Sequence, residues 1–334
     1  MKTPPHSSVN IQKVLTIAGS DSGGGAGLQA DLKVITSLGG YGMTVVTAIT
    51  AQNTLGVTKI QGIDLDVIEA QIDAVVSDIG VDAVKIGMLS SPEIVHCVAA
   101  ALRRHAIKTI VLDPVLRATS GASLGGDATA HAMRDVLFPL ATVITPNMEE
   151  ASILLGRPVL EPDDFEQAAR DLLQMGPSAV LIKGGHLNAK HTQLMDFLMW
   201  RASDEDGNHV IEQQKLLHYR VNTPNTHGTG CSLSSAIATY LAQGHQLRHA
   251  VAKAIAYVEA GLEAGIYLSI GAGAGPLWHM HAFYPTALPI CITTIFGGGI
   301  TCSVDTNGML SIVGWTRTET ISTLCITYHY HVGY

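Results

Sequence analysis

Short apolar runs alternate along the chain with longer segments whose apolar residues recur every three or four positions. Residues 14–18, with the sequence VLTIA, are apolar and rich in β-branched side chains, so this run predicts a buried strand. Leu28, Leu32 and Ile35 then recur at helical spacing and predict an amphipathic helix. A strand followed directly by a helix is the repeating unit of α/β proteins.

The same succession repeats over most of the chain. Further buried strands are predicted at residues 44–50, 83–86, 109–112, 142–145 and 179–182. One of the intervening helical patterns begins at Asp66 and carries Glu69 three residues later, which resembles a capping box. Residues 195–200 and 210–217 flank a polar segment and predict a hairpin. As a whole, the pattern predicts one doubly wound, mostly parallel sheet with helices on both faces.

The alternation of strands and helices stops near residue 284. Residues 286–334 are rich in threonine, isoleucine and glycine, and their Asp, Glu, Lys and Arg residues are only Asp305, Arg317 and Glu319. We therefore expect an N-terminal extension over residues 1–12, one α/β domain over 13–284, and a C-terminal tail over 285–334.

Composition narrows the class of protein. The chain has 334 residues, and its 47% hydrophobic content is enough for a sizeable core. Its net charge of −8 offers no basic surface, so we expect neither nucleic acid nor an anionic membrane as a partner. The 5 cysteines form no C-x-x-C pair, and the first residues contain no apolar signal segment. These features predict a cytoplasmic protein with reduced thiols.

A glycine-rich segment follows the first predicted strand. Gly25, Gly27 and Ala30 fit the G-x-G-x-x-A pattern of dinucleotide-binding loops. That pattern also requires an acidic residue about 20 positions later, at the end of the next strand. The next strand ends instead in Ala51-Gln52-Asn53, which disfavours a nicotinamide cofactor. Gln52 is either a plain turn residue or an amide that binds a neutral heterocycle, because an amide both donates and accepts hydrogen bonds.

Polar side chains also follow the later strands, where open α/β sheets bind their ligands. Asp113 either binds Mg²⁺ or orients a phosphate, or it caps a turn. Asn147 and Glu150 are three residues apart, so they either share the water shell of a metal or form a helix cap. Lys183 can reach a phosphate, although no Walker A loop is present. Asp31 is either an exposed carboxylate or a ligand contact.

The segment with the strongest chemical signal is Gly-Thr-Gly-Cys at residues 228–231. It leads directly into a helical pattern marked by Leu233, Ile237 and Leu241. The start of such a helix carries free N–H groups and a positive dipole end, which together attract phosphate. A thiol at this position either has its pKa lowered, to roughly 3.5–7.5, and serves as base or nucleophile, or is a buried inert cysteine.

Several segments together carry a family resemblance. These segments are AGSDSGGGAGLQADLK, TAITAQNT, KIGML, VLDPV, TPNMEEA, KGGH and NTHGTGCSLSSAIA. Their sequences, order and spacing resemble those of the hydroxymethylpyrimidine and phosphomethylpyrimidine kinases of thiamine biosynthesis, which belong to the ribokinase-like superfamily. The resemblance spans about residues 13–284 and implies a ribokinase-like α/β fold for that domain.

The resemblance also implies a reaction and a set of roles. The implied reaction transfers the ATP γ-phosphoryl group to 4-amino-5-hydroxymethyl-2-methylpyrimidine and then, in a second step, to its monophosphate, with ATP and Mg²⁺ as cofactors. The implied roles are substrate binding by Gly19, Asp31, Gln52 and Met88, catalysis by Cys231 as base with Gly228, Thr229 and Gly230 as anion hole, ATP binding by Asn147, Lys183 and Thr226, and Mg²⁺ binding by Asp113 and Glu150. Family members are often homodimers, so the resemblance also implies a homodimer.

Three other functions remain open at this point. A pyridoxal or pyridoxine kinase is the nearest, because that vitamer is also a ring with a hydroxymethyl group and some relatives share the cysteine. A nucleotide-binding regulator without catalytic activity would bind ATP but phosphorylate no hydroxymethyl heterocycle. A nicotinamide oxidoreductase is disfavoured by the missing acidic residue after Gln52.

Overall fold

The computed structural model describes residues 10–116, 126–185, 193–204 and 206–284, together with the backbone of 302–304 and 310–312. The chain divides into two compact units, Met1–His281 and Ala282–Tyr334. In the second unit, β10 (Cys302–Val304) pairs antiparallel with β11 (Leu310–Ile312). The rest of the expected tail and most of the expected N-terminal extension lie outside the described residues, so both expectations stay predictions.

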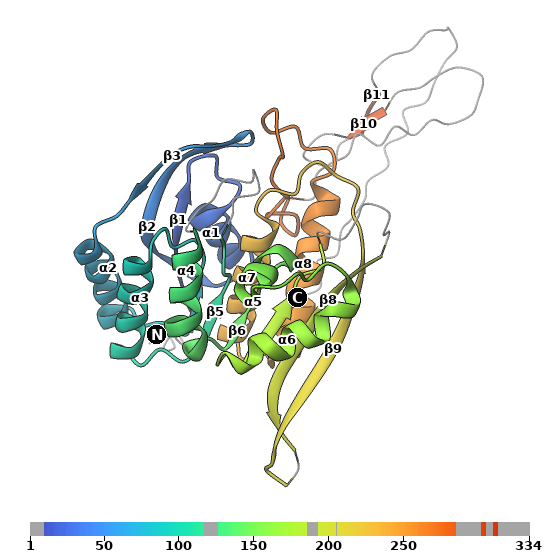
Figure 1. Cartoon of the computed structure of the whole chain (residues 1–334). Helices are drawn as coiled ribbons and strands as arrows, with labels where there is room; N and C mark the ends of the chain where they lie inside the picture. The colour runs from blue at the N-terminus through green and yellow to red at the C-terminus, as the bar shows by residue number, and fades with distance from the viewer. Residues whose placement is uncertain are drawn as a thin grey trace, which may run out of the picture. The chain divides into compact units, whose positions relative to one another are not determined.

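A single sheet runs through the first unit, in the strand order β3-β2-β1-β4-β5-β6-β7-β8-β9 (Figure 1). The six strands from β2 to β7 in this order pair in parallel, and β3, β8 and β9 join antiparallel at the two edges. The strands are β1 (Lys13–Asp21), β2 (Tyr41–Asn53), β3 (Gly56–Gly62), β4 (Ala83–Ile86), β5 (Ile110–Leu112), β6 (Val143–Ile144), β7 (Ala179–Ile182), β8 (Gln193–Ser203) and β9 (His209–Tyr219). The predicted doubly wound, mostly parallel sheet is confirmed.

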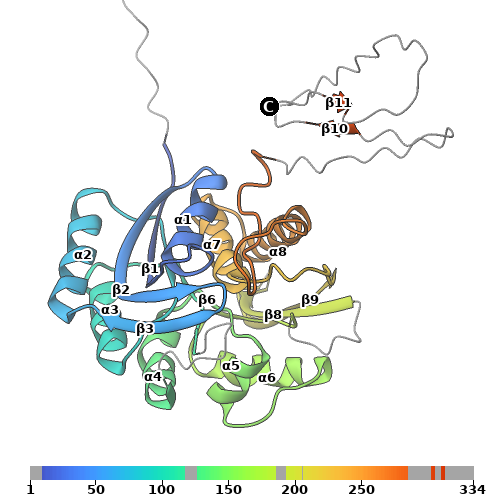
Figure 2. The same cartoon turned by 90° about the horizontal axis from the view of Figure 1, so that it is seen from above.

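Helices cover both faces of this sheet (Figure 2). The helices that pack with α1 on one face are α7 and α8, and the helices of the other face are α2 to α6. The helical elements are α1 (Gly27–Ser37), α2 (Leu65–Asp78), α3 (Pro92–Arg104), α4 (Gly126–Ala132), η1 (Met133–Leu137), η2 (Phe138–Leu140), α5 (Met148–Leu155), η3 (Pro162–Asp164), α6 (Phe165–Gln174), α7 (Thr229–Ala242) and α8 (Leu247–Ala264).

Buried strands such as β5 contribute side chains to two separate hydrophobic cores. In β5, Ile110 and Leu112 pack into the core under α2 to α6, whereas Val111 between them packs into the core under α1, α7 and α8. Successive side chains of a strand point to opposite faces of the sheet, so a strand covered on both faces is apolar except where a buried polar side chain has a partner, as Lys85 of β4 has in Asp31. This requirement explains why the predicted strands are continuous apolar runs and not alternating ones.

Two features of the fold differ from the sequence prediction. The strand that contains Gln52 continues to Asn53 and turns into β3, an exposed edge strand that its apolar pattern did not predict. The helix predicted to be capped by Asp66 and Glu69 begins at Leu65 instead, with Asp64 in the N-cap position and no side-chain cap bond. The predicted hairpin near residues 195–217 is confirmed as β8 and β9, which are longer than expected.

The carboxyl ends of the parallel strands meet at one edge of the sheet. Asp21 ends β1, Met88 follows β4, Asp113 follows β5, and Lys183 follows β7. These four side chains come from distant parts of the sequence but line one cavity. Among the helices described here, none combines the length and the apolar character needed to cross a membrane.

Candidate active site

A cavity of about 620 Å³ lies at the carboxyl edge of the sheet. All but one of the site residues expected from the sequence line it. They are Gly19, Gln52, Met88, Asp113, Asn147, Glu150, Lys183, Thr226, Gly228, Thr229, Gly230 and Cys231. Asp31 is the exception, and it is not among the lining residues. Apart from Asp31, these residues thus share one cavity, and the roles expected of them stay predictions.

The first turn of α7 forms one wall of the cavity. The helix begins at Thr229, four residues before Leu233, the first residue of its apolar stripe, and Gly228 is its N-cap with φ 82° and ψ 6°. Only glycine adopts this left-handed conformation readily. A Cβ at Gly228 would also overlap the carbonyl oxygen of Gly25 in the first glycine-rich segment. Glycine at both positions thus allows the two glycine-rich segments to touch. The amide groups of the first turn of α7 have no partner within the helix, and they face the cavity.

Lys183 and Asp113 lie directly opposite this helix start. The Lys183 ammonium nitrogen is 2.7 Å from Asp113 Oδ1, which also accepts a hydrogen bond of 2.9 Å from the Thr145 hydroxyl. A Cβ built at Gly230 would lie 3.4 Å from Lys183 Nζ and 3.6 Å from Asp113 Oδ2. A positive side chain, a carboxylate and a helix N-terminus therefore lie around one point, where the lysine and the helix start attract phosphoryl oxygens and the carboxylate can hold a cation.

Asn147 and Glu150 form the capping box that the sequence left as one of two readings. The Asn147 side chain accepts a hydrogen bond of 2.9 Å from the Glu150 amide, and the Glu150 carboxylate accepts one of 2.8 Å from the Asn147 amide. Glu150 Oε2 is also 3.9 Å from Lys183 Nζ. Burial raises the pKa of Glu150 to about 7, against the opposing effect of Lys183 and with a smaller rise from Asp113. Part of the Glu150 population therefore carries a proton at neutral pH.

The electrostatic surroundings of Cys231 distinguish between the two readings that the sequence left open. Burial raises the pKa of its thiol to about 11, although the Lys85 ammonium lowers it and the carboxylates of Asp31 and Asp113 raise it further. Of the two readings that the sequence left open, the raised pKa therefore favours the buried cysteine over the thiol with a lowered pKa in the free protein, because loss of hydration outweighs the effect of the helix start. The thiol is mainly protonated at neutral pH.

Asp31 is held in a buried ion pair under the first turns of α7. Its carboxylate contacts Lys85 Nζ at 2.8 Å and 2.9 Å and accepts hydrogen bonds from Thr16 Oγ1 at 2.6 Å and Ser235 Oγ at 2.7 Å. Both members of the pair are 0% exposed. Lys85 lines the cavity, whereas Asp31 sits behind it. Sequence reasoning missed Lys85, although a lysine inside the apolar run AVKI signals a buried charge that needs a partner.

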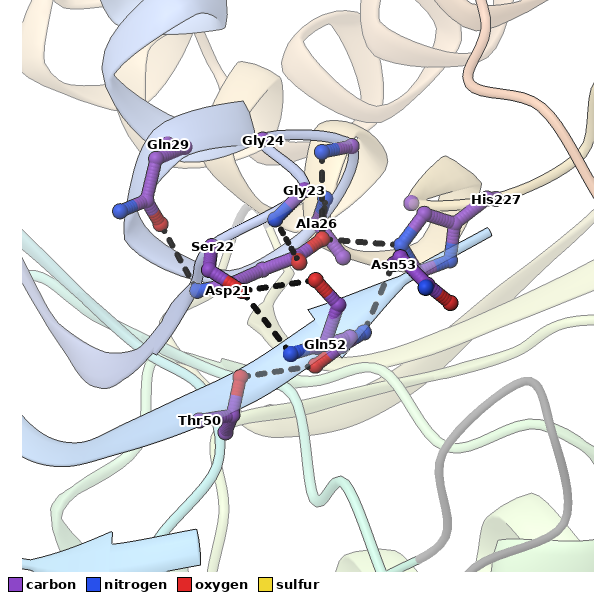
Figure 3. A network of polar contacts seen from close by, with 12 residues as sticks. Asp21, Ser22, Gly23, Gly24, Ala26, Gln29, Thr50, Gln52, Asn53 and His227 are labelled. Carbon is purple, nitrogen blue, oxygen red and sulfur yellow. Dashed lines mark hydrogen bonds and ion pairs between the residues drawn. The ribbon is translucent and has the colours of Figure 1, made fainter. Parts of the chain in front are cut away.

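A second polar network organises the glycine-rich segment after β1 (Figure 3). The Asp21 carboxylate accepts hydrogen bonds from the amides of Gly23, Gly25 and Ala26, at 2.8, 3.1 and 2.8 Å, and from His227 Nε2 at 2.9 Å. Burial works against this charge, but the His227 contact and the backbone amides hold the pKa of Asp21 below its ordinary value. Neither Asp21 nor His227 was expected to have a role, although both lie inside the glycine-rich motifs.

Gln52, Met88 and Gly19 lie together at one end of the cavity. A Cβ at Gly19 would lie 2.7 Å from the Met88 methyl group, so the glycine leaves room for the thioether. The Gln52 side chain lies between Thr50 Oγ1, 3.2 Å from its oxygen, and His227 Nε2, 3.5 Å from its nitrogen. An apolar side chain beside a fixed amide is a suitable surface for a flat, neutral, nitrogen-containing ring.

The opposite end of the cavity combines apolar helix residues with a histidine. Ile255, Val258 and Leu262 of α8 line it. His218 of β9 lies with Nε2 3.5 Å from Asp196 Oδ2 and Nδ1 3.5 Å from Glu259 Oε1. Burial works against protonation, but the two carboxylates raise the pKa of His218 above its ordinary value. This end has the mixed apolar and polar lining of a nucleotide base site.

The arrangement of donors fits Mg²⁺ held with phosphates more than a metal held by the protein alone. In the described part of the chain, no group of three or more His, Cys, Asp or Glu side chains is placed to hold a metal ion. Mg²⁺ commonly binds through one or two carboxylates together with substrate phosphates and water. Asp113 meets this requirement. Lys183 and Thr145 both contact its oxygen Oδ1, whereas its other oxygen, Oδ2, faces the Gly230 position.

The fold and the cavity define a class of protein. A doubly wound sheet carries, at its carboxyl edge, a glycine-capped helix N-terminus that faces a lysine and a carboxylate. Gln52 and Met88 line the same cavity. These are the parts of a phosphotransferase of the ribokinase-like class, in which positioning and charge stabilisation carry most of the catalysis.

Comparison with known proteins names the family. The family described as phosphomethylpyrimidine kinase matches residues 21–278. The chain is 47% identical over 272 residues to the hydroxymethylpyrimidine/phosphomethylpyrimidine kinase of Rhizobium meliloti, which covers 81% of this chain and 97% of that protein. The chain therefore belongs to the phosphomethylpyrimidine kinase family.

Solved structures place the fold next to two kinds of kinase. A phosphomethylpyrimidine kinase from Clostridium difficile is 40% identical, with a TM-score of 0.62, and the match covers 74% of this chain and 98% of that one. The pyridoxal kinase of Bacillus subtilis in complex with ADP is 36% identical, with a TM-score of 0.71, and the match covers 81% of this chain and 98% of that one. The expected ribokinase-like fold is confirmed.

Proposed function

We propose that this protein phosphorylates 4-amino-5-hydroxymethyl-2-methylpyrimidine to its monophosphate and then to its diphosphate, with ATP as donor, in thiamine biosynthesis. One observation carries the proposal. The start of α7, Lys183 and Asp113 surround a single point in a cavity whose neighbouring end holds Gln52 and Met88. Family membership supports the choice of pyrimidine and its phosphate as substrates.

The proposed step needs little covalent chemistry from the protein. The hydroxymethyl oxygen forms a bond to the γ-phosphorus while the bond from that phosphorus to the bridging oxygen breaks, and ADP leaves. The amides of Gly228 to Cys231 and the Lys183 ammonium stabilise the charge on the moving phosphoryl group. The hydroxyl proton passes to Cys231 when the cysteine is a thiolate, a form that the nearby Lys85 favours.

ATP is proposed to span the rest of the cavity. Its base would occupy the end lined by Ile255, Val258 and His218, and Asn147 and Thr226 would contact its phosphates. A Mg²⁺ ion would be held by Asp113 and Glu150 together with phosphate oxygens, and it would neutralise charge that builds up during transfer. Glu150 would lose its proton when the ion binds, because a nearby positive charge favours the carboxylate.

A product assay with ATP and the free pyrimidine tests the proposal. We expect monophosphate first and diphosphate later, resolved by anion-exchange chromatography. ATP binding without any product from the pyrimidine, its monophosphate or pyridoxal would favour a regulator. The purified protein without added Mg²⁺, with EDTA present, is the control for the metal and should give no product.

Pyridoxal kinase remains a second candidate for a specific reason. The structures that match this fold with TM-scores of 0.71 and 0.72 include pyridoxal kinases of Bacillus subtilis and Staphylococcus aureus. Pyridoxal and the proposed pyrimidine substrate both carry a hydroxymethyl group on a six-membered ring. Turnover of pyridoxal together with no reaction of the pyrimidine monophosphate would replace our proposal with this one.

The assembly and the compartment are also proposals. We propose a homodimer in the cytoplasm, without nucleic acid as a partner, on the basis of the family resemblance and the net charge of −8. Light scattering of the purified protein would detect the dimer as twice the chain mass of 35.2 kDa. A single species at the chain mass would contradict it.

A further inference from the structure

The Gln52 side-chain amide lies between His227 and Thr50, each of which makes a shorter hydrogen bond to another residue. Figure 3 shows its nitrogen toward His227 Nε2, at 3.5 Å, and its oxygen toward Thr50 Oγ1, at 3.2 Å. An amide has a donating end and an accepting end of nearly the same shape, so its polarity is set by its partners. The two partners therefore determine which end lies where.

His227 offers a donor on the side of Gln52. Its Nε2 lies 2.9 Å from Asp21 Oδ2, and Asp21 accepts three backbone amide bonds besides. Those contacts hold the pKa of Asp21 below its ordinary value, so the carboxylate is ionised and only accepts. His227 Nε2 must therefore carry the proton. A protonated ring nitrogen has no lone pair, so it cannot accept a hydrogen bond from an NH₂ group 3.5 Å away, whereas an oxygen in that place can share the N–H with Asp21.

Thr50 offers an acceptor on the other side. Its hydroxyl has a single proton and lies 2.8 Å from the Ser20 carbonyl oxygen, the shorter of its two contacts. A carbonyl oxygen only accepts, so the Thr50 proton goes to Ser20. Thr50 Oγ1 then has only lone pairs to offer to Gln52. A donor from Gln52 satisfies it, and an oxygen in that place leaves two acceptors facing each other.

We propose that Asp21, His227 and Thr50 are positioning residues that fix the Gln52 amide with its oxygen toward His227 and its NH₂ group toward Thr50. A half-turn of the amide from the orientation in Figure 3 gives this arrangement and removes both conflicts. The inference rests on the proposed function, because it assigns the direction in which the pyrimidine lies.

The direction follows from the substrate's own hydrogen-bonding edge. Ring nitrogen N3 accepts and the neighbouring 4-amino group donates, so this edge pairs with an amide in one orientation, amino group to oxygen and N3 to NH₂. With the oxygen toward His227, the 4-amino group lies on the His227 side. The 5-hydroxymethyl group is next to the 4-amino group and farther from N3, so it lies on that side too. His227 directly precedes Gly228, the N-cap of α7, so the hydroxymethyl group faces the phosphoryl site.

The opposite amide orientation would turn the ring around and move the hydroxymethyl group to the Thr50 side. A 4-oxo pyrimidine has the reverse edge, with N3–H as donor and the carbonyl as acceptor. It should bind the fixed amide turned around, with its hydroxymethyl group away from α7. We therefore expect the 4-oxo analogue to inhibit the wild-type enzyme competitively and to be phosphorylated poorly.

Two matched pairs of variants test the proposal. Thr50→Val removes the acceptor with little change of shape, and Thr50→Ser keeps it. His227→Met removes the donor, and His227→Gln keeps an N–H group near the Nε2 position. The measured quantity is the ratio of kcat/KM for the 4-amino pyrimidine to that for its 4-oxo analogue. We expect this ratio to fall about tenfold or more in Thr50→Val and His227→Met and to stay within about threefold of wild type in the two conservative variants.

The ratio separates positioning from general damage. Loss of stability lowers both kcat/KM values together and leaves their ratio unchanged, and the KM for ATP should also stay constant. An unchanged ratio in both Thr50→Val and His227→Met, with the wild type active on the 4-amino pyrimidine, would overturn this inference alone. If the wild type phosphorylates no hydroxymethylpyrimidine, the proposed function itself fails.

Discussion

At the scale of single residues, the site contains groups whose charge is set by burial more than by their neighbours. Cys231 and Glu150 both have pKa values above their ordinary range, to about 11 and about 7. The pKa of each group should shift when nucleotide and metal bind, because phosphate favours the neutral form of an acidic group and a metal ion favours its ionised form. The pH dependence of the enzyme should therefore report on them.

Cys231 gives the first prediction. If its thiolate accepts the substrate proton, kcat/KM for the pyrimidine should rise with pH through neutrality and continue to rise toward the thiol pKa of about 11. Cys231→Ser should lower turnover by about 10- to 1000-fold and leave ATP affinity nearly unchanged. The pH–rate profile and ATP titration measure both effects, with Cys97→Ser as control. A Cys231→Ser enzyme with wild-type turnover would exclude the role as base.

Glu150 gives a prediction about stability. Its folded-state pKa of about 7 lies above the ordinary value of 4.5, so the folded protein binds this proton more tightly than the unfolded chain does. The free energy of unfolding should therefore fall as pH rises from about 4.5 to 7, by on the order of 1–3 kcal/mol from this group. Glu150→Gln should remove most of this fall in urea unfolding at several pH values. The exposed neighbour in Glu149→Gln serves as control and should leave the fall in place.

The site residues that sequence reasoning found are those whose type and position already imply chemistry. Asp113 and Lys183 come directly after buried strands, where parallel sheets collect their ligand contacts. Asp31 was misplaced because helical spacing shows only that it borders an apolar face, and its partner Lys85 is 54 residues away in sequence. Burial could not be read from the sequence either, and for this reason the sequence left open whether the pKa of Cys231 is lowered or the thiol is a buried, inert one.

At the scale of elements, the start of α7 depends on a contact between two loops. Gly228 combines a left-handed backbone with close approach to Gly25. Gly244, at the other end of the same helix, has a similar φ of 85° but nothing within 4 Å of its Cβ position. This pair of glycines separates backbone strain from steric overlap within one element.

The two glycines give a matched prediction. Gly244→Ala should destabilise the protein by about 1 kcal/mol, the cost of a left-handed backbone for a residue with a Cβ. Gly228→Ala should destabilise it further and lower turnover by at least about 100-fold, because the helix start must move away from Gly25 and the amides leave the phosphoryl site. Thermal unfolding and the product assay compare the two variants. Equal effects would mean that the contact with Gly25 is unimportant.

The elements themselves were largely predictable, and the exceptions have physical causes. Strands buried on both faces are continuous apolar runs, so the sequence marks β1 and β4 to β7 clearly. β3 is exposed on the sheet edge, where packing imposes no apolar pattern, and it escaped prediction. The first turn of α7 lies before the apolar pattern that marks this helix in the sequence, because glycine and polar residues there follow no apolar period.

At the scale of the whole molecule, one buried ion pair joins four elements. Asp31 of α1 contacts Lys85 of β4, Thr16 of β1 and Ser235 of α7. A buried charge that loses its partner is expensive, but a pair removed together is much less so. The pair therefore links the sheet to both helices that carry the glycine-rich segments.

Removing one partner should reveal this link. Lys85→Met should lower the free energy of unfolding by about 3–5 kcal/mol, because Asp31 is left charged and buried. The exposed lysine in Lys59→Met is the control and should change it by less than about 0.5 kcal/mol. The double variant Asp31→Asn with Lys85→Met should lose less than the two single variants combined, as measured by denaturant unfolding. Additive losses would show that the two side chains act independently.

The last residues of the first unit also hold the phosphoryl site in place. The His227 amide donates to the Gly275 carbonyl oxygen at 2.9 Å, and Ser232 in the first turn of α7 contacts His279 Nε2 at 3.0 Å. During translation, α7 is made some fifty residues before these contacts, since proteins emerge N-terminus first. A nascent chain arrested before residue 275 would thus lack the contacts that hold His227 and the first turn of α7. The chain would become competent for catalysis only after Gly275 and His279 had left the ribosome.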